Sequence, residues 1–352
     1  MVKRRINKLF SIAFAISLLV NILSAQVISP FNKIALKDTS SVYSFIVSGH
    51  FHGASTNVST FPASTILSNL DTLNALHPLF LMSLGDMFLD VNETYIHNYK
   101  KSLFDKLKMP LFNAVGNHDV SNGNRYEKEY GSSYFTLKNG TELFIILNTE
   151  INDGSIKGDQ FDFLVEAVRS AGNYKNIFIF SHRPIWAENN SRYKNLFIGN
   201  TRTEIGRNNF EDVVLPLLMN YSKVKHFYWI SGSMAGGPAS FFYDKDPVST
   251  ITYMQSAIRD QERDAVLQIF INKGVVRFNG ISLTGQNLDA VENYNLSFWK
   301  NTISPEQKFN YRLLPYLTKQ MLLHYYFWIG FVSSLVLFFS LRWVYKKWKR
   351  KK

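Results

Sequence analysis

The sequence predicts an α/β fold with mixed sheets, followed by one transmembrane helix near the C-terminus. Six short apolar runs of strand length each stop at a glycine or a polar turn. Segments with helical spacing lie between these runs, and such alternation is typical of layered α/β domains. Near the end of the chain, Met321–Leu341 is a stretch of 21 uncharged residues, which is long enough to cross a hydrocarbon core.

The positive charge of the chain gathers at its two ends. The 352 residues are 46% hydrophobic, ample for a core, and carry a formal net charge of +12. Residues 1–25 hold four basic residues and residues 342–352 hold seven, with no acid in either segment, which leaves +1 for the remainder. This distribution indicates membrane topology, and no nucleic-acid binding is expected. The absence of cysteine excludes disulfides, a thiolate nucleophile and Cys-type zinc sites.

The first 25 residues have the layout of a signal peptide. Met1–Lys8 is basic, Leu9–Val20 is apolar, and Leu23-Ser24-Ala25 precedes Gln26. A charged segment, an apolar segment and a small residue before the cut are typical of export signals. We expect cleavage after Ala25, with an uncleaved signal anchor as the alternative.

The central part of the chain, residues 42–283, contains the strands and helices of the predicted domain. The six apolar runs predict strands at Val42–Val47, Leu79–Leu84, Leu111–Val115, Glu142–Leu147, Asn176–Phe180 and His226–Ile230. Helical spacing predicts helices at Thr65–Leu76, Tyr95–Leu107, Asp159–Ser170 and, interrupted by Pro216, Phe210–Met219. Two later runs, Ala265–Ile271 and Val275–Ile281, flank Asn272-Lys273-Gly274 and predict an antiparallel hairpin, so the sheet is mixed.

The end of the chain predicts a membrane anchor. Residues 284–320 read as a linker containing Pro305 and Pro315, residues 321–341 as the membrane span, and residues 342–352 as a basic cytoplasmic tail. Aromatic residues flank the span on both sides, as in an interfacial belt: Tyr325, Tyr326, Trp328, Trp343, Tyr345 and Trp348. We therefore expect a single-pass protein of the cell membrane with its domain outside the cytoplasm, and a buried core helix is the alternative.

Polar side chains follow the apolar runs at the points where strands are predicted to end. They are His50, His52, Asp86, Asn117, His118 and His182. Ligands in open α/β sheets bind beyond the carboxyl ends of strands. A carboxylate can bridge two divalent cations, while imidazoles and an amide oxygen complete their coordination. Two adjacent metal ions suit the hydrolysis of phosphate esters, and an imidazole outside the ligand set can protonate the leaving group. The alternative is that these residues are turn caps and structural histidines.

Three of these segments resemble motifs of the calcineurin-like metallophosphoesterases. They are Gly85-Asp86, Gly116-Asn117-His118-Asp119, and His182 with Pro184 two residues later. The resemblance extends from Tyr43 to Ile281 and implies a four-layer α-β-β-α sandwich with two mixed sheets. It also implies one or two divalent metal ions (Mn, Fe or Zn). Its implied catalytic residues are His118 and Asp119, and its implied metal ligands are His50, His52, Asp86, Asn117 and His182.

Arg183 and Asn117 are the candidates for binding the substrate phosphate, although a solvated arginine is the alternative for Arg183. The substrate class implied is a phosphate mono- or diester, either a small molecule or a lipid or glycan phosphate.

Two motifs depart from the family pattern. His50 stands where the family has Asp, and Ser233 and Ala235 stand where it has two histidines. By the family's scheme, one metal would use His50, His52 and Asp86, and the other would use Asp86, Asn117 and His182. Each set lacks one ligand, which weakens metal binding. The sequence therefore leaves two functions open: a metal-dependent phosphoesterase, or a pseudoenzyme that binds a ligand or partner at the membrane.

Overall fold

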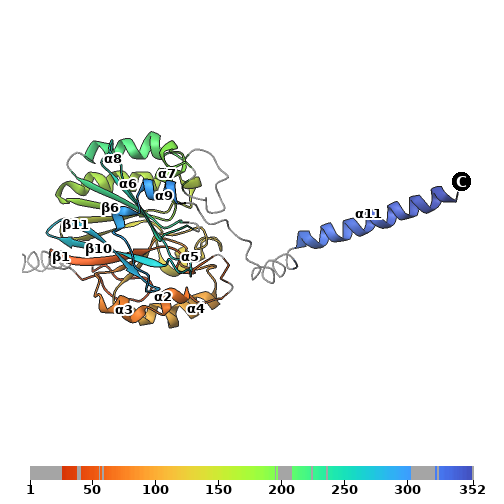
Figure 1. Cartoon of the computed structure of the whole chain (residues 1–352), viewed down its shortest axis with the longest axis horizontal. Helices are drawn as coiled ribbons and strands as arrows, with labels where there is room; N and C mark the ends of the chain where they lie inside the picture. Colours follow the sequence, from red (N-terminus) through yellow and green to blue (C-terminus); the bar gives the residue numbers. More distant parts are fainter. Residues whose placement is uncertain are drawn as a thin grey trace, which may run out of the picture. The chain divides into compact units, whose positions relative to one another are not determined.

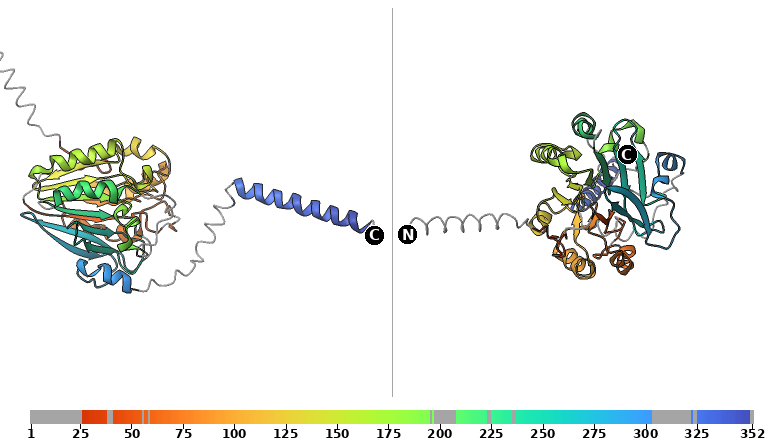
Figure 2. Two further views of the ribbon diagram at one scale, coloured as in Figure 1. Left: turned by 90° about the horizontal axis from the view of Figure 1, so that it is seen from above. Right: turned by 90° about the vertical axis from the view of Figure 1, so that its left-hand side faces the viewer.

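The chain folds into two mixed β-sheets packed face to face, with helices outside each sheet (Figures 1 and 2). This computed structural model describes residues 26–37, 41–54, 56–57, 59–194, 196, 208–222, 225–234, 237–302, 322 and 325–350. In Figure 1, helices α2, α3 and α4 lie on one side of the sheets, and α6, α7 and α8 lie on the other. The predicted α-β-β-α order and mixed sheets are thus confirmed.

The first sheet has the strand order β11-β10-β1-β2-β3. Its strands are β1 (Val42–Ser48), β2 (Leu81–Ser83), β3 (Leu111–Asn113), β10 (Ala265–Asn272) and β11 (Val275–Ser282). The three strands β1, β2 and β3 run parallel, whereas β10 pairs antiparallel with β1 and forms the predicted hairpin with β11. The carboxyl ends of the three parallel strands therefore meet at one edge.

The second sheet has the strand order β4-β5-β6-β7-β9-β8. Its strands are β4 (Phe135–Asn139), β5 (Glu142–Ile146), β6 (Asn176–Ser181), β7 (His226–Ser231), β8 (Phe241–Lys245) and β9 (Thr252–Ser256). The strands β5, β6, β7 and β9 run parallel, and antiparallel β4 and β8 close the two sides. All six predicted apolar runs are strands, three neighbouring ones in each sheet.

Aromatic side chains join the two sheets. The ring of Phe45 on β1 lies edge-on to Phe144 on β5 and to Phe178 on β6, each at a centroid distance of 5.2 Å. All three side chains are fully buried. Edge-to-face aromatic pairs contribute about 0.5–1.5 kcal/mol each beyond the area they bury. This packing fixes the two sheets, and hence their strand-end loops, relative to each other.

Two predicted helices are divided in the structure. The segment predicted as one helix over Thr65–Leu76 forms α2 (Ser64–Leu67) and α3 (Leu70–Ala75). Between them, the Asn69 side chain donates hydrogen bonds to the carbonyl oxygens of Thr65 and Leu283, in the way that Asn competes with helical backbone bonds. The segment predicted as Tyr95–Leu107 forms α4 (Glu93–Ser102) and the 3-10 turn η1 (Phe104–Lys106).

The remaining helices lie mostly near the second sheet. Helix α6 (Asp159–Arg169) agrees with its prediction. The interrupted segment forms the π-helical turn η5 (Phe210–Val214), which continues directly into α8 (Leu215–Ser222), with Pro216 next to the junction of the two. The other short helices are α5 (Arg125–Tyr130), α7 (Ile185–Glu188), η2 (Asn152–Gly154), η3 (Ser170–Asn173) and η4 (Ser191–Tyr193).

The packed domain continues past the predicted boundary at residue 283. The turn η6 (Val291–Asn293) and helix α9 (Leu296–Asn301) follow β11, and the indole nitrogen of Trp299 donates a hydrogen bond to the carbonyl oxygen of Phe241, 3.0 Å away. The packed domain therefore extends at least to the end of α9 at Asn301, and the linker predicted over 284–320 begins later than expected. Its residues 303–320, like the predicted signal peptide, lie outside the described residues.

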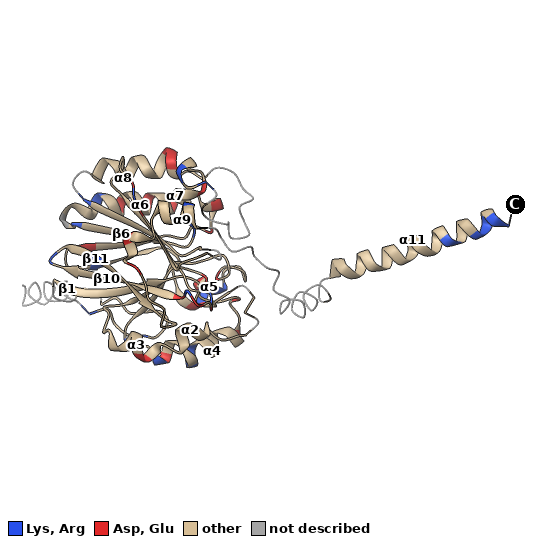
Figure 3. Ribbon diagram, in the orientation of Figure 1, with Lys and Arg blue, Asp and Glu red and all other residues tan. Residues whose placement is uncertain are grey.

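Helix α11 (Tyr325–Lys349) is long and apolar enough to cross a membrane. None of its residues is buried, which argues against the alternative of a core helix. The helix continues through most of the predicted tail, and lysine residues occupy its last turn, as Figure 3 shows.

Candidate metal centre

One carboxylate oxygen lies among three imidazoles where the two sheets meet. The Oδ2 atom of Asp86, in the loop after β2, is 3.5 Å from Nδ1 of His50 and 3.6 Å from Nε2 of His52, both in the loop after β1. It is 3.4 Å from Nε2 of His182, in the loop after β6. All four side chains are at most 1% exposed. The strand-end rule thus predicts correctly that these residues converge.

These facing atoms have no hydrogen-bond partner. The ring nitrogens of His50 and His52, Nε2 of His182 and Oδ2 of Asp86 are all buried and unpartnered. A buried polar atom without a partner costs about 1–3 kcal/mol, so such atoms are rare unless a ligand satisfies them. Imidazole nitrogen and carboxylate oxygen are donors that divalent transition metals accept. The residues present therefore fit the metal ions that the sequence motifs imply.

The five candidate side chains form two groups that share Asp86. His50 and His182 form one group with Asp86, and His52 and His118 form the other, with the ligand atoms of each group within 4.8 Å of one another. This differs from the expected division, in which His50 and His52 shared a metal and His118 stood outside the ligand set. The backbone explains the difference, because His50 follows the end of β1 in a left-handed conformation (φ 60°) that separates its direction from that of His52.

Backbone carbonyls orient two of the imidazoles. The Nδ1 atom of His182 lies 2.9 Å from the carbonyl oxygen of Leu84, and Nδ1 of His118 lies 3.0 Å from that of Leu89. A carbonyl only accepts hydrogen bonds, so Nδ1 carries the hydrogen in both rings. In the neutral rings, Nε2 then presents its lone pair. Such outer hydrogen bonds hold metal-ligating histidines in the required tautomer.

Close backbone contacts bring the loops together. The amide nitrogen of His50 donates to the carbonyl oxygen of Gly85 (2.9 Å), and that of His118 donates to Oδ1 of Asp86 (3.0 Å). A Cβ atom on Gly116 would lie 2.3 Å from Oδ1 of Asp86. A Cβ atom on Gly232 would lie 2.0 Å from the carbonyl oxygen of Leu84. The glycines at these two positions are therefore needed for the approach of neighbouring loops.

The electrostatic environment favours an ionised Asp86 and a neutral His50, whereas the pKa of His182 is raised, because the charge of Asp86 outweighs the effect of burial there. Burial raises the pKa of Asp86, but the surrounding imidazoles, His182 most strongly, outweigh it and hold that pKa well below its usual range. Burial holds the pKa of His50 well below its ordinary value, and the positive charge of Arg259 lowers it further. At neutral pH the site thus contains an ionised carboxylate and a neutral His50 imidazole, which are the forms that bind metal ions.

Asp119, expected to be catalytic, is hydrogen-bonded to two neighbouring loops. Its fully buried carboxylate accepts hydrogen bonds from the amide nitrogens of Phe88 and Gly116, each at 3.0 Å, and from Nδ2 of Asn113 at 3.1 Å. Burial raises the pKa of Asp119, and the nearby charge of Asp86 raises it further. Both oxygens of Asp119 thus connect its loop to Phe88 in the loop after β2 and to Gly116 and Asn113, and its catalytic role stays a prediction.

Arg183, expected to bind the substrate phosphate, is paired with an acid. Its Nε and Nη2 atoms donate to the two carboxylate oxygens of Glu188 at 2.7 and 2.8 Å. A bidentate pair of this kind uses the planar edge of the guanidinium that a phosphate would use. Two donors of Arg183 are therefore used by Glu188, and its phosphate-binding role stays a prediction.

The loop after β7 lies against the loop that carries His182. The amide nitrogen of Ser233 donates to the carbonyl oxygen of His182 (2.7 Å), and Nε2 of Gln255 donates to the carbonyl oxygen of Ser233 (2.9 Å). Ser233 thus occupies the place expected for it, whereas Ala235 lies outside the described residues. Asn117 is half-buried between Gly116 and His118, and its role as a ligand stays a prediction.

Two charged residues near the centre were not predicted. Glu150 follows the end of β5, its Oε1 atom is buried without a partner, and burial raises its pKa to about 7. Arg259 follows β9 and is 9% exposed. The strand-end rule could have found Glu150, which comes directly after Asn148 and Thr149. Arg259 gave no signal because β9 was not recognised as a strand.

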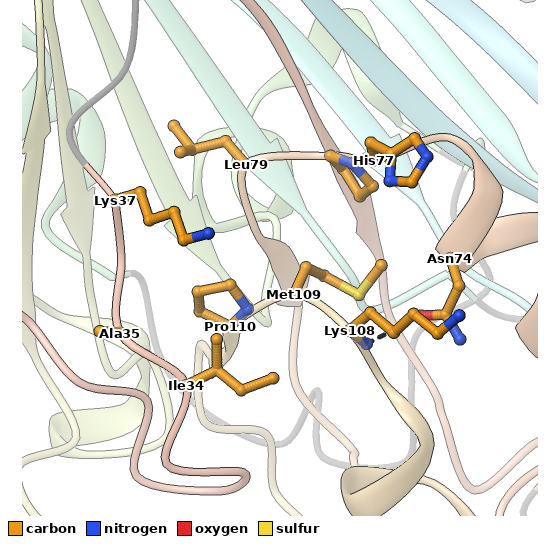
Figure 4. Close-up of a pocket in the computed structure, with 10 residues that line it drawn as sticks. Ile34, Ala35, Lys37, Asn74, His77, Leu79, Lys108, Met109 and Pro110 are labelled. Atoms are coloured by element: carbon orange, nitrogen blue, oxygen red, sulfur yellow. Dashed lines mark hydrogen bonds between the residues drawn. The ribbon is translucent and has the colours of Figure 1, made fainter.

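A separate pocket of about 280 Å³ lies at the other end of the first sheet (Figure 4). Leu79 and Pro110, which line it, precede β2 and β3, whereas Asp86 and His118 follow these strands. Since β2 and β3 are parallel, the pocket and the candidate metal centre lie at opposite strand ends. The pocket is therefore not part of the centre.

Several solved phosphatase structures are similar to this chain at low identity. A dimetal phosphatase from Danio rerio is 12% identical, over 69% of this chain and 96% of that chain, with a TM-score of 0.47. A predicted phosphoesterase from Streptococcus pneumoniae is 10% identical, over 70% and 92%, with a TM-score of 0.32. No family model and no curated protein sequence matches the chain. At these TM-scores and identities, the similarities do not decide the activity of this chain.

Proposed function

We propose that this chain is a metal-dependent phosphoesterase that hydrolyses a phosphate mono- or diester. The observation that carries the proposal is the set of buried, unpartnered nitrogen and oxygen atoms around Oδ2 of Asp86. A structural cluster of histidines would pair these atoms with one another or with the backbone. Their arrangement instead leaves the electron pairs that divalent Mn, Fe or Zn would take up.

The residues that would hold the metal are His50, His52, Asp86 and His182, with Asn117 in addition. When bound, divalent cations neutralise phosphate charge and lower the pKa of a coordinated water. The chain itself supplies rigidity: Oδ1 of Asp86 accepts the hydrogen bond from the His118 amide, which leaves Oδ2 for the centre. Because these groups are held before the substrate arrives, little reorganisation is needed during the reaction.

His118 is the candidate proton donor to the leaving group. Its side chain is half-buried, whereas those of His50, His52 and His182 are fully buried, so it lies on the solvent side of the centre. The Nδ1 hydrogen is used by the Leu89 carbonyl, so only the doubly protonated ring can give a proton to a leaving oxygen, from Nε2. The same Nε2 lone pair lies in the group with His52 and Asp86, and the experiment below separates the two roles.

The proposed cellular setting is the outer face of a membrane. Helix α11 would anchor the chain as a single-pass protein, with its basic end in the cytoplasm and the domain outside. The residues 1–25 would provide export. In this setting the substrate is a small phosphoester or a lipid or glycan phosphate.

Hydrolysis by the full chain, purified in detergent, tests the proposal. With Mn²⁺ added, we expect turnover of 4-nitrophenyl phosphate or of bis(4-nitrophenyl) phosphate.

His118→Ala should lower kcat about 100-fold while Mn²⁺ stays bound, because it removes the proton donor. His97→Ala, which changes an exposed imidazole on α4, is the matched control and should have no effect. A chain that binds Mn²⁺, Fe²⁺ or Zn²⁺ in no measurable amount and hydrolyses neither ester contradicts the proposal. Loss of Mn²⁺ in His118→Ala makes His118 a ligand.

The second candidate is a binding protein without hydrolytic activity. Ser233 favours it, because a hydroxyl is a weaker metal ligand than the imidazole expected there. A chain that binds phosphate or a phosphoester without converting it would support this candidate.

A further inference from the structure

Arg259 is a largely buried cation whose guanidinium forms no direct ion pair among the described residues. Its side chain is 9% exposed, and Nε donates to the carbonyl oxygen of Met234 at 3.1 Å. Among the described residues, no carboxylate forms an ion pair with its guanidinium, and the terminal nitrogens make no hydrogen bond. The nearest acid in sequence, Asp264, accepts from the backbone nitrogen of Arg259 and from Oγ1 of Thr65 instead. The charges of Asp86 and Asp264 partly offset that of Arg259, but its terminal nitrogens have no hydrogen-bond acceptor among the described residues, and an anion would supply one.

The backbone places Arg259 between two loops of the candidate metal centre. The extension of β9 runs beside Gly49, because Ala257 pairs with Gly49 and the amide of Ile258 donates to the Gly49 carbonyl oxygen at 3.2 Å. Gly49 directly precedes His50. On the other side, Met234 follows Ser233, whose amide is bonded to the carbonyl oxygen of His182. The backbone of Arg259 thus follows a segment bonded to Gly49, and its Nε atom is hydrogen-bonded to the loop that carries Ser233 and Met234.

The charge of Arg259 acts on the metal ligands themselves. Burial lowers the pKa of His50, and the charge of Arg259 lowers it further. Burial also lowers the pKa of Arg259 itself, against the opposing charges of Asp86 and Asp264. Arg263, in the same loop, provides the contrast. Its Nη1 atom donates to the carbonyl oxygen of Ala239 and to Oγ of Ser240, so its donors serve the fold.

We propose that Arg259 binds the phosphate group of the substrate through the terminal nitrogens of its guanidinium, beside the metal ligands. The inference rests on the proposed function, since the anion is the phosphate of that reaction. A guanidinium forms charge-assisted hydrogen bonds with two phosphate oxygens at once. Arg259 thereby supplies positive charge next to the loop in which Ser233 stands where the resembled motif has a histidine. It binds the phosphate in place of Arg183, whose guanidinium is paired with Glu188.

The test is a calorimetric titration of the full chain with inorganic phosphate in the presence of Mn²⁺. Arg259→Gln should raise the Kd for phosphate about 10- to 100-fold, because it removes a charged hydrogen-bond donor. Arg259→Lys keeps the charge but loses the fork, so its Kd should rise less. The Mn²⁺ affinity of both variants should be retained or increased, since a neighbouring positive charge is removed or moved. Arg263→Lys is the matched control and should leave the phosphate Kd within about twofold.

The outcomes separate this inference from the proposed function. Phosphate affinity that is unchanged in both Arg259 variants, or phosphate affinity that falls only together with Mn²⁺ affinity, overturns the inference. Hydrolysis by the wild-type chain leaves the proposed function standing in either case. If Arg259→Gln does not fold, Arg259→Lys decides alone: an unchanged Kd for phosphate overturns the inference, and an increased Kd at normal Mn²⁺ affinity supports it.

Discussion

The two sheets contribute unequally to the candidate metal centre. Loops after the first sheet supply four of the five grouped side chains, His50, His52, Asp86 and His118, whereas the second sheet supplies His182 alone. Relative to the motifs that the sequence resembles, the first sheet keeps a metal-capable residue, because His50 stands where the motif has Asp. The second sheet has no such substitute, because Ser233 stands where the motif has a histidine. The difference indicates that metal binding depends mainly on the first sheet, and that His182 is the residue through which the second sheet takes part.

Within the second sheet, removing the single histidine should have the largest effect. His182→Ala deletes a ligand from the group with His50 and Asp86 and should weaken Mn²⁺ binding by about 100-fold or more, since even outer-shell losses cost about 10–100-fold. The measurement is calorimetric titration with Mn²⁺. His226→Ala, which changes the exposed histidine at the start of β7, is the control. Equal Mn²⁺ affinity of both variants would show that the second sheet plays no part in metal binding.

Glu150, also from the second sheet, should make stability depend on pH. Its pKa is raised from 4.5 to about 7, so the folded state holds the proton more tightly than the unfolded state. The stability contribution of this proton is therefore lost as pH rises from about 4.5 to 7. In the metal-free chain, Glu150→Gln should increase the free energy of unfolding by up to about 3 kcal/mol at pH 8 and by little at pH 4.

Urea unfolding of the metal-free chain at both pH values measures this effect. Glu166→Gln on α6 is the matched control, because Glu166 is 69% exposed and only faces Arg169 in a surface pair. A gain in stability that is the same at pH 4 and pH 8 would show that Glu150 is not a buried acid with a raised pKa.

In the first sheet, the loop support should matter for stability as well as for metal binding. Asp119→Asn leaves one of the donors Phe88, Gly116 and Asn113 without its acceptor and should lower the free energy of unfolding by about 1–3 kcal/mol. Thermal or urea unfolding measures the change, and Asp105→Asn, at an exposed pair with Lys100, should change it by less than about 0.5 kcal/mol. Normal stability with lost hydrolysis would instead support the catalytic role of Asp119 expected from the sequence.

Introducing the histidine of the resembled motif into the second sheet should have the smallest effect. Ser233→His adds an imidazole to the loop bonded to His182 and should increase Mn²⁺ affinity about tenfold. The titration used for His182→Ala measures it. If the Mn²⁺ affinity stays unchanged while the variant folds normally, Ser233 does not face the metal ions. The unequal contribution of the two sheets to metal binding then has another cause.

The sequence predicts the strands of the parallel core and most of the centre. Apolar runs such as Val42–Val47 are local signals, and the polar residues that follow them must meet where parallel strands end. Strands β8 and β9 were missed because polar residues interrupt their apolar character, as in Thr252–Ser256. The division of the Thr65–Leu76 helix depends on Asn69 bonding to distant Leu283, which no local pattern shows.

The grouping of ligands and the nearby charges depend on tertiary structure. His50 and His52 are two residues apart in the sequence, yet the left-handed backbone at His50 directs them to different groups. Arg183 pairs with Glu188, whereas Arg259 meets the centre only because β9 pairs beside Gly49. Motif spacing identifies the residue types of the centre. It does not show that Arg183 forms an ion pair whereas Arg259, among the described residues, forms none.

Equilibrium titration of the purified full chain with Mn²⁺, compared with Asp86→Asn, tests the central claim most directly. Both ligand groups contain Asp86. The wild-type chain should bind Mn²⁺, and Asp86→Asn should lose this binding by more than about 100-fold, because the shared carboxylate is a direct ligand. A wild-type chain that binds no Mn²⁺, Fe²⁺ or Zn²⁺, or an Asp86→Asn variant that binds Mn²⁺ as tightly as wild type, would contradict the account.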